Sequence, residues 1–367
     1  MKILLLAGEE SGLIYANRLK ERLAAHEIRT YADYGFKTSD LAVMGFVAVV
    51  RRLGFFMRVK KTMERAVREW RPDVVCTVDY PGMNLKLSAY AKSLGIRTLH
   101  VVCPQVWAWR AGRIPEIEAA TDRLCCFLPF EPSLFRAGFA EYVGHPLAEL
   151  AAEERAAAAS RGGVEPPRPV LALLPGSRLG EIKRNLPAML DAAALAAGPG
   201  VETVVPAANA EAGEAIGRIL AARGASTLRV HVTDGGARDV LRSARCAVVA
   251  SGTATLEAAF ARCPTVLVYR VSPALAFFAR HVIKGVKHIG LVNVVWEKSG
   301  GEGEAPMPEL LQEDFTAGNV ARLIGKWLES GDERAAAAAS LDRVVSRLET
   351  GSGAIAAIAA EIEGKGK

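Results

Sequence analysis

The segment Leu171–Glu181, which reads LALLPGSRLGE, decides the fold of the second half of this chain. The apolar run Val170–Leu174 has the length and composition of a buried strand, and an amphipathic helix pattern follows the break at Pro175–Ser177. A strand, a glycine turn and a helix together direct free backbone N–H groups toward an anion. Arg178 adds a guanidinium fork for phosphate oxygens. A plain turn with a surface arginine is the alternative interpretation.

Composition narrows the class of protein. The 367 residues, of which 50% are apolar and 23% charged, predict two folded domains with sizeable cores. A net charge of +6 suits anionic ligands or an anionic membrane surface, whereas few aromatic residues and no recognisable binding motif argue against nucleic acid. The six scattered cysteines form no C-x-x-C pair, which is typical of reduced thiols in the cytoplasm. We expect no signal peptide and no spanning helix, so membrane contact would be peripheral.

The front of the chain repeats the strand, glycine turn and helix plan, with Ile3–Ala7 as its first strand. A second strand, Val74–Val78, ends at Asp79. Ligands of open α/β sheets bind at the carboxyl ends of strands, which makes Asp79 a candidate general base, with a turn or capping aspartate as the alternative. The next strand, Arg97–Val102, leads into a segment with two tryptophans and two arginines, which indicates the wall of a cleft.

The stretch from Leu41 to Lys61 combines bulky apolar residues with clustered cations. One interpretation is a core helix with a solvated basic face. The other is a membrane-surface patch, with apolar side chains at the acyl boundary and cations on anionic headgroups. The apolar members of that patch are Leu53, Phe55, Phe56 and Met57, and the basic members are Arg51, Arg52, Arg58, Lys60 and Lys61. A second basic and apolar stretch covers Leu275–Ile283.

The second half contains another strand, Cys246–Ala250, which ends at a run of small residues, SGTATLE, covering Ser251–Glu257. Small side chains let the backbone approach a diphosphate, and in this interpretation Glu257 accepts hydrogen bonds from ribose hydroxyls. A helix cap followed by an ordinary helix glutamate is the alternative. No G-x-G-x-x-G follows the first strand of either half, which argues against a nicotinamide cofactor. Without an Asp-x-Asp pair or a His/Glu cluster, we expect neither a metal nor another cofactor.

Six motifs, taken in order along most of the chain, resemble the lipid-A-disaccharide synthase family. They are Cys103–Arg113, Leu128–Glu131, Gly144–Pro146, Leu174–Arg178, Ser251–Glu257 and Pro308–Gln312. The resemblance implies an inverting, metal-independent hexosyltransferase of the GT-B architecture, in which two Rossmann-like α/β domains with parallel sheets face a cleft. It implies transfer of 2,3-diacylglucosamine from UDP to 2,3-diacylglucosamine 1-phosphate, which gives a β-1,6 disaccharide and UDP in lipid A biosynthesis. The implied location is cytoplasmic and peripheral, on the inner face of the cytoplasmic membrane; a homodimer is left open.

The same resemblance assigns domains and site residues. Residues 1–160 form the acceptor and membrane-facing domain, residues 161–330 the UDP-sugar donor domain, and residues 331–367 helices that pack back on the first domain. The expected donor residues are Gly176, Ser177, Arg178, Glu181, Ser251, Gly252, Thr253, Ala254, Thr255, Glu257 and Asn293. The expected acceptor-side residues are Ser11, Asn84, Gln105, Trp107, Trp109 and Arg110, with Asp79 as the catalytic base.

Three departures from the family pattern fall in the acceptor half. Leu13 replaces an aspartate of the opening loop, Gly82 stands where some members have a second aspartate, and residues 24–40 are shortened. They leave open the acceptor's identity and whether full activity is retained, and the sequence does not indicate the acyl-chain length. The alternatives are another transferase or epimerase that acts on UDP-N-acetylglucosamine-type sugars, and a non-catalytic lipid- or nucleotide-binding relative.

Overall fold

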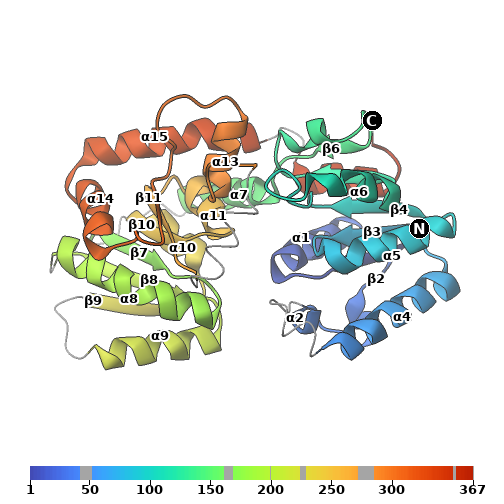
Figure 1. Cartoon of the computed structure of the whole chain (residues 1–367), viewed down its shortest axis with the longest axis horizontal. Coiled ribbons are helices and arrows are strands. Elements are labelled where there is room, and N and C mark those ends of the chain that lie inside the picture. Colours follow the sequence, from blue (N-terminus) through green and yellow to red (C-terminus); the bar gives the residue numbers. More distant parts are fainter. Residues whose placement is uncertain are drawn as a thin grey trace. The chain divides into compact units, whose positions relative to one another are not determined.

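The computed structural model describes residues 1–41, 52–160, 168–198, 200–223, 229–271, 285–349 and 353–366, without the side chains of residues 10, 11, 39 and 158–160. The chain forms two compact units (Figure 1). The first unit comprises Met1–Pro146 and Leu348–Lys367, and the second unit comprises Leu147–Arg347. Each unit is built on its own parallel sheet.

The first unit has six described strands in the order β2-β1-β3-β4-β5-β6. They are β1 (Lys2–Ala7), β2 (Glu27–Arg29), β3 (Val74–Val78), β4 (Arg97–Val101), β5 (Arg123–Cys126) and β6 (Ala140–Tyr142). From β1 the chain passes to one edge at β2 and then returns to β3 on the other side of β1. This reversal between β1 and β3 is a topological switch point, where loops at the carboxyl ends of strands diverge and leave room for a ligand.

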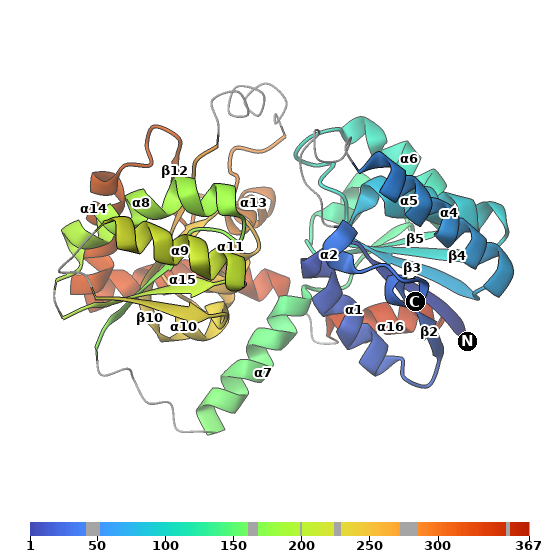
Figure 2. The ribbon, with the colours of Figure 1, turned by 90° about the horizontal axis from the view of Figure 1, so that it is seen from below.

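Helices cover both faces of this sheet (Figure 2). They are α1 (Glu10–Arg22), α2 (Thr38–Leu41), α4 (Leu53–Trp70), α5 (Pro81–Ser93), α6 (Ile114–Ala120) and α16 (Ala354–Ile362), with short 3₁₀ helices at Tyr31–Tyr34, Ala111–Arg113 and Glu131–Leu134. Alternation along β1 sends Ile3 and Leu5 to the face covered by α1 and α16, and Leu4 and Leu6 to the face covered by α4 and α5. Every residue from Ile3 to Ala7 is therefore buried.

A buried carboxylate attaches α16 to this sheet. Glu361 accepts two hydrogen bonds from Arg123, each at 3.2 Å, and lies 3.7 Å from a guanidinium nitrogen of Arg97. Arg97 also donates to the main-chain carbonyl of Ile362 at 3.1 Å. Only 4% of Glu361 is exposed, so its charge depends on these two arginines.

The second unit has a six-stranded sheet of the same kind, in the order β12-β11-β10-β7-β8-β9. Its strands are β7 (Val170–Leu174), β8 (Glu202–Ala207), β9 (Arg229–Asp234), β10 (Ala244–Ala250), β11 (Thr265–Tyr269) and β12 (Glu309–Leu311). Here the chain runs from β7 out to β9 and returns at β10, so the switch point lies between β7 and β10.

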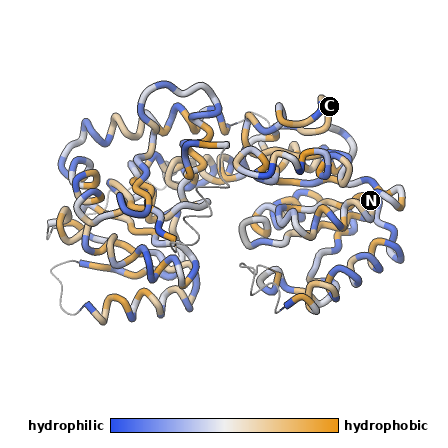
Figure 3. Tube along the Cα trace, viewed as in Figure 1, coloured by the Kyte–Doolittle hydropathy of each residue, from blue (hydrophilic) through white to orange (hydrophobic). Residues whose placement is uncertain are grey.

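The helices of the second unit are α7 (Pro146–Ser160), α8 (Leu179–Ala196), α9 (Ala210–Ala222), α10 (Ala237–Ser243), α11 (Ala254–Phe260), α13 (Leu291–Lys298), α14 (Ala317–Glu329) and α15 (Gly331–Leu348). One face of the sheet packs against α8, α9 and α14 through a single apolar cluster. The inner strands β7, β10 and β11 are apolar and buried along most of their length, as expected for strands covered on both sides. Hydrophobic and hydrophilic positions alternate along the helices (Figure 3), and the edge strand β9 is mostly exposed.

The unit boundaries differ from those expected at two places. The first unit ends at Pro146, so α7 joins the second unit almost entirely, and α15 joins it as well. Of the segment 331–367, the part that begins at Leu348 packs with the first unit, through α16. Residues 42–51, which include Arg51 of the expected membrane patch, lie outside the described residues, as does the whole second basic stretch 275–283.

Candidate active site

The turn after β3 has an unusual backbone. Asp79 and Tyr80 both have positive φ values, 53° and 52°, a left-handed conformation that bulky L residues rarely adopt. Pro81 then starts α5. The main-chain N–H of Tyr80 donates to Oδ1 of Asp79 at 2.8 Å, which fixes the orientation of the carboxyl group at the β1/β3 switch point.

Gly8 of the β1–α1 loop packs against this turn, and Gly12 of α1 packs against the end of β3. A Cβ atom at Gly8 would lie 2.5 Å from the Cβ of Tyr80, and one at Gly12 would lie 3.3 Å from a methyl group of Val78. Gly8 therefore lets the loop after β1 lie directly on the turn that carries Asp79, and Gly12 lets α1 approach the end of β3. Ser11 is in the first turn of α1, and its side chain is outside the described part of the chain.

Asn84 has a different role from the one expected. Its side chain is completely buried, and its Nδ2 donates to the carbonyls of Asp79 at 2.7 Å and Val78 at 3.3 Å. Its Oδ1 accepts a hydrogen bond from the Tyr31 hydroxyl at 2.8 Å. Because the amide donors are used inside the unit, Asn84 supports the Asp79 turn instead of facing an acceptor.

The electrostatics of Asp79 favour proton transfer. Burial raises the pKa of its carboxyl group above the usual range, and the hydrogen bond from the Tyr80 N–H offsets part of this effect. A carboxylate with a raised pKa is a stronger base. A carboxylate of this kind is suited to accept a proton from a hydroxyl group.

The tryptophan segment after β4 divides into an exposed and an anchored part. Gln105, Trp109 and Arg110 are exposed, and the Arg110 guanidinium stacks 4.4 Å from the centre of the Trp109 ring. Trp107 is half-buried, and its Nε1 donates to Glu131 at 3.0 Å. Burial raises the pKa of Glu131 to about 8. Trp107 therefore anchors the segment, and the exposed three can contact a ligand.

A group of three side chains in this region could in principle hold a metal ion. Within the described part of the chain, Cys103, Cys126 and Glu131 place potential ligand atoms within 4.8 Å of one another. The two carboxyl oxygens of Glu131 already accept hydrogen bonds, from Trp107 and from the Leu128 N–H at 3.1 Å. Hydrogen bonding with Cys126 and burial raise the pKa of the Cys103 thiol, so the protonated form is favoured. Hydrogen bonds within the protein therefore explain why these three side chains lie together.

The histidine of the Gly144–Pro146 motif lies in the core of the first unit. Only 5% of His145 is exposed, and its ring packs 5.3 Å from that of Phe127. Burial lowers its pKa to about 3, so the neutral imidazole is present at physiological pH.

In the second unit, the loop after β7 contains the expected phosphate-binding sequence. Gly176 has φ of 110°, and a Cβ atom there would lie 2.4 Å from Oε2 of Glu181. Glu181 pairs with the Arg178 guanidinium at 3.1 Å across the first turn of α8. Ser177 and Arg178 are exposed. Glu181 thus orients Arg178, while the loop amides and the guanidinium stay accessible to an anion.

The loop after β10 lies beside it, on the other side of the β7/β10 switch point. Ser251 and Ala254 are half-buried, and Gly252, with φ of 156°, and Thr253 are exposed. The hydroxyl of Thr255 is buried and donates to the Gly252 carbonyl at 2.8 Å, so it stabilises the loop rather than facing a ligand. The exposed backbone is the part that can approach a diphosphate.

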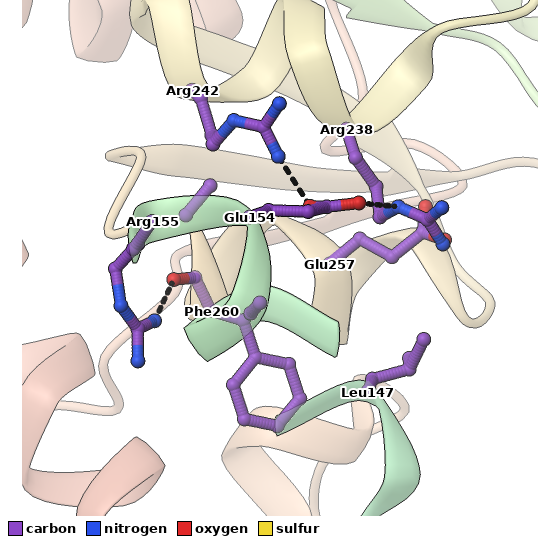
Figure 4. A pocket seen from close by; sticks show the side chains of 9 residues that line it. Leu147, Glu154, Arg155, Arg238, Arg242, Glu257 and Phe260 are labelled. Carbon is purple, nitrogen blue, oxygen red and sulfur yellow. Dashed lines mark hydrogen bonds and ion pairs between the residues drawn. The ribbon is translucent and has the colours of Figure 1, made fainter. Parts of the chain in front are cut away.

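Glu257 follows on α11 and lines a pocket with residues of α7 and α10 (Figure 4). Burial raises the pKa of Glu257, the nearby Arg238 acts in the opposite direction, and Glu154 adds to the increase. The lining residues are Leu147, Ala151, Glu154, Arg155, Arg238, Arg242, Glu257, Phe260 and Ala261.

Asn293 is also assigned differently by the structure. It is buried on α13, where its Nδ2 donates to the Met307 carbonyl at 2.7 Å and to Glu309 at 2.8 Å. Its Oδ1 accepts from the Met307 N–H at 3.1 Å. The expected contact with the donor is replaced by a structural role, since these bonds connect α13 to the start of β12.

Comparison with known proteins places these features in a family. The family model for lipid-A-disaccharide synthetase matches residues 3–362. The chain belongs to the lipid-A-disaccharide synthetase family. A lipid-A-disaccharide synthase of Geobacter metallireducens is 34% identical over 99% of this chain and 98% of its own length. The enzyme of that name from Neisseria meningitidis (strain Z2491) is 38% identical over 81% of this chain and 77% of its own length.

Solved structures agree on the fold. The calicheamicin glycosyltransferase CalG4 has a TM-score of 0.60 at 15% identity and covers 99% of this chain and 97% of its own. Acinetobacter baumannii MurG has a TM-score of 0.57 at 12% identity, with 99% of each chain covered. At these identities the likeness concerns the fold alone, and it confirms the expected GT-B arrangement of two Rossmann-like domains.

Helix α4 of this lipid-A-disaccharide synthetase family member was expected to present four apolar residues to a membrane. Leu53 and Met57 are 57% and 48% exposed. Phe55 and Phe56 are instead partly buried against the core that α4 shares with α5, and the Phe55 ring lies 6.0 Å from that of Phe36. The patch is therefore smaller than expected, because both phenylalanines contribute to packing. Among the described residues, no helix has the length and apolar character needed to span a membrane.

Several functional candidates of this family member were missed from the sequence. Glu309 accepts hydrogen bonds from the main-chain N–H groups of Ile289 and Gly290, and so fixes the start of α13. Arg238 and Glu154 face Glu257 from α10 and α7. Glu309 lies in the Pro308–Gln312 motif, although no individual role was expected of it, and no local motif marks Arg238 or Glu154.

Proposed function

We propose that this chain transfers a 2,3-diacylglucosamine unit from UDP to 2,3-diacylglucosamine 1-phosphate, forming a β-1,6-linked disaccharide and releasing UDP. The observation that carries the proposal is the family match over residues 3–362. The positions of the candidate loops support it independently. Asp79 lies at the switch point of the first sheet, and the loops of Arg178 and Gly252 lie at that of the second.

In the proposed reaction the acceptor binds to the first unit. Asp79 removes the proton from the 6-hydroxyl group of the acceptor as that oxygen attacks the anomeric carbon of the donor. The new C–O bond forms on the face opposite the departing UDP, so the configuration at the anomeric carbon inverts. Exposed Gln105, Trp109 and Arg110 are the proposed acceptor contacts, and Arg110 carries the charge that suits a sugar phosphate.

The donor binds to the second unit in this proposal. The loop amides at Gly176 and Ser177, the Arg178 guanidinium and the exposed backbone at Gly252–Thr253 meet the charge that develops on the diphosphate as the glycosidic bond breaks. Glu257 accepts hydrogen bonds from the ribose hydroxyls. The ion pair with Glu181 preorganises Arg178, and the hydrogen bond from Thr255 preorganises the Gly252 loop.

Both substrates carry acyl chains, so the enzyme must meet them at a bilayer. We assign this contact to the face of α4 that exposes Leu53 and Met57 beside Arg52, Arg58 and Lys61. The contact is peripheral and is directed at the anionic cytoplasmic leaflet.

Product analysis tests this function. The purified protein is incubated with UDP-2,3-diacylglucosamine and 2,3-diacylglucosamine 1-phosphate, and the products are identified by mass spectrometry while UDP release is followed. A disaccharide phosphate with four acyl chains, formed in equal amount to UDP, is the expected result. Turnover of UDP-N-acetylglucosamine at the same rate would identify a transferase or epimerase for soluble sugars, and no turnover of any UDP-sugar would contradict catalysis.

A further inference from the structure

Arg238 lies between two carboxylates of the second unit (Figure 4). Its Nε is 3.0 Å from Oε1 of Glu154, which it reaches from α10. Glu257, from α11, lines the same pocket, and its side chain points toward Arg238 in Figure 4. Arg238 of α10 therefore pairs with α7 and shares a pocket with Glu257 of α11.

Glu154 is held on its other side as well. Arg242, one helical turn after Arg238, hydrogen-bonds to Oε2 of Glu154 and also pairs with Asp239. Glu154 thus connects α7 to two arginines of α10. The second partner limits the movement of Glu154, and Glu154 in turn limits the movement of Arg238.

The surroundings of Glu257 explain why a cation is needed there. The pocket beside Glu257 has apolar walls at Leu147, Ala151, Phe260 and Ala261. The charged groups that face this pocket are Arg238 and Arg242 of α10 and Glu154 and Arg155 of α7, and Arg155 donates to the Phe260 carbonyl at 3.2 Å. An apolar wall and a nearby carboxylate both disfavour the ionised form of Glu257. The positive charge of Arg238 favours the ionised form and so opposes both effects.

We propose that Arg238, anchored by Glu154 in the pocket that Glu257 lines, is a positioning residue whose charge favours the ionised form of the Glu257 carboxylate that binds the ribose hydroxyls of the UDP donor. The inference rests on the proposed function, in which Glu257 binds the ribose. An ionised carboxylate accepts hydrogen bonds from both hydroxyls of a vicinal diol, whereas the protonated group loses acceptor capacity. Loss of Arg238 therefore weakens UDP binding at low pH and much less at high pH.

The test measures UDP affinity by titration calorimetry between pH 5 and pH 8.5. In Arg238→Gln, the acid limb of the plot of UDP affinity against pH moves to higher pH by about one unit. At pH 8.5 the affinity of this variant returns to near the parent value. Arg238→Lys keeps the charge and leaves the limb near its original position. Arg238→Gln combined with Glu154→Gln moves the limb back toward the parent, because the opposing negative charge has also been removed.

Two controls separate positioning from folding and from the titration of UDP. Arg242→Gln removes an equal charge from the same helix and the same carboxylate, and it shifts the limb by less than half as much. The Glu257→Gln variant has no titratable side chain at this position. Its plot of UDP affinity against pH therefore records the titration of the UDP phosphate, whose pKa is about 6. Thermal denaturation of each variant confirms that it is folded at the temperature of the titration.

The outcomes separate the two levels of the proposal. A uniform loss of affinity in Arg238→Gln with an unmoved limb, or an equal shift in Arg242→Gln, overturns the positioning role. If Glu257→Gln weakens UDP binding while the limb of Arg238→Gln stays in place, only the positioning role fails. If Glu257→Gln binds UDP like the parent at every pH, the ribose contact itself is wrong and the donor site must be reassigned.

Discussion

The side-chain amide of Asn84 donates a hydrogen bond to the main-chain carbonyl of Asp79 at 2.7 Å. The other end of the same amide is held by the Tyr31 hydroxyl at 2.8 Å. Asp79 and Tyr80 keep an unfavourable left-handed backbone, and this persists only where surrounding contacts determine it. The carboxyl group of Asp79 is therefore oriented before any substrate binds.

Replacing Asp79 tests its role as the base. Asp79→Asn keeps the size of the side chain but removes its basicity, and we expect turnover to fall by about 10²–10⁴-fold with donor affinity retained. The matched control is Asp73→Asn, an exposed aspartate of the same unit that accepts a hydrogen bond from the Lys2 N–H. Full turnover in Asp79→Asn would show that another group removes the proton.

The pH dependence of the reaction has a definite direction. Burial raises the pKa of Asp79, and the base acts only when it is ionised. The acid limb of kcat/KM is therefore expected at a higher pH than the value of about 3.9 for an ordinary aspartate. Activity rises with pH through this limb.

Arg178 supplies the charge for the proposed diphosphate site. We expect Arg178→Ala to lower UDP affinity by about 10- to 100-fold, since a hydrogen bond to a charged group contributes about 1.5–3 kcal/mol. Lys183→Ala removes another exposed cation of α8 and serves as the control. Isothermal titration measures both variants. Equal UDP affinity in Arg178→Ala and the parent would place the diphosphate elsewhere.

The membrane contact is tested at Leu53 and Met57. We expect Leu53→Ser combined with Met57→Ser to weaken binding to anionic vesicles while the melting temperature changes little, because both side chains are exposed. Leu195→Ser, at a leucine of the second unit that is 68% exposed, controls for loss of surface hydrophobicity in general. Sedimentation with vesicles measures all three, and unchanged binding of the double variant would refute the contact.

The same helix offers a contrast that follows from the structure. Phe55 and Phe56 pack against the core of the first unit. Phe55→Ser combined with Phe56→Ser is therefore expected to lower the melting temperature, unlike the change at Leu53 and Met57. A double phenylalanine variant that melts like the parent would show that these rings contribute little to packing.

Two buried histidines predict the acid stability of the first unit. Burial lowers the pKa of His100 and of His145 to about 3, from about 6.5 in the unfolded chain. Because the folded-state pKa is depressed, the stabilisation is complete above pH 6.5 and is lost as pH falls from 6.5 toward 3. Over this pH range each histidine lowers the free energy of unfolding by about 1.4 kcal/mol for every pH unit.

Urea denaturation at several pH values measures this loss. His145→Gln is expected to reduce the slope of stability against pH below 6.5. His231→Gln, at an exposed histidine of β9, leaves the slope unchanged. Equal slopes in the parent and His145→Gln would mean that the ring gains a proton without leaving the core.

Glu361 is expected to be a major contributor to the stability of α16. Glu361→Ala leaves Arg123 and Arg97 without their shared buried carboxylate, and removing one partner of a buried ion pair costs about 3–5 kcal/mol. Glu363→Ala, at the more exposed partner of His26, is the control and should change the melting temperature far less. Similar melting temperatures for both variants would contradict this assignment.

The sequence predicted the fold well because an unbroken apolar run, such as Val170–Leu174, is typical of a strand that is buried on both faces. It also placed Asp79 and Arg178 correctly at strand ends, since chain order and turn residues determine those positions. It misassigned Asn84 and Asn293, because an amide next to a loop has the same local signature whether it contacts a ligand or a carbonyl. Burial decides between these roles, and burial depends on distant elements.

The position of α16 has a consequence for biosynthesis. The apolar face of β1, β3 and β4 is completed by Ile355, Ile358 and Ile362, which the ribosome adds only after it has made the whole of the second unit. The nascent first unit must therefore wait, with part of its sheet uncovered, while about 200 further residues are translated, which takes roughly 10–40 seconds at bacterial rates. We expect chaperones that bind exposed apolar strands to recognise the growing polypeptide during that interval.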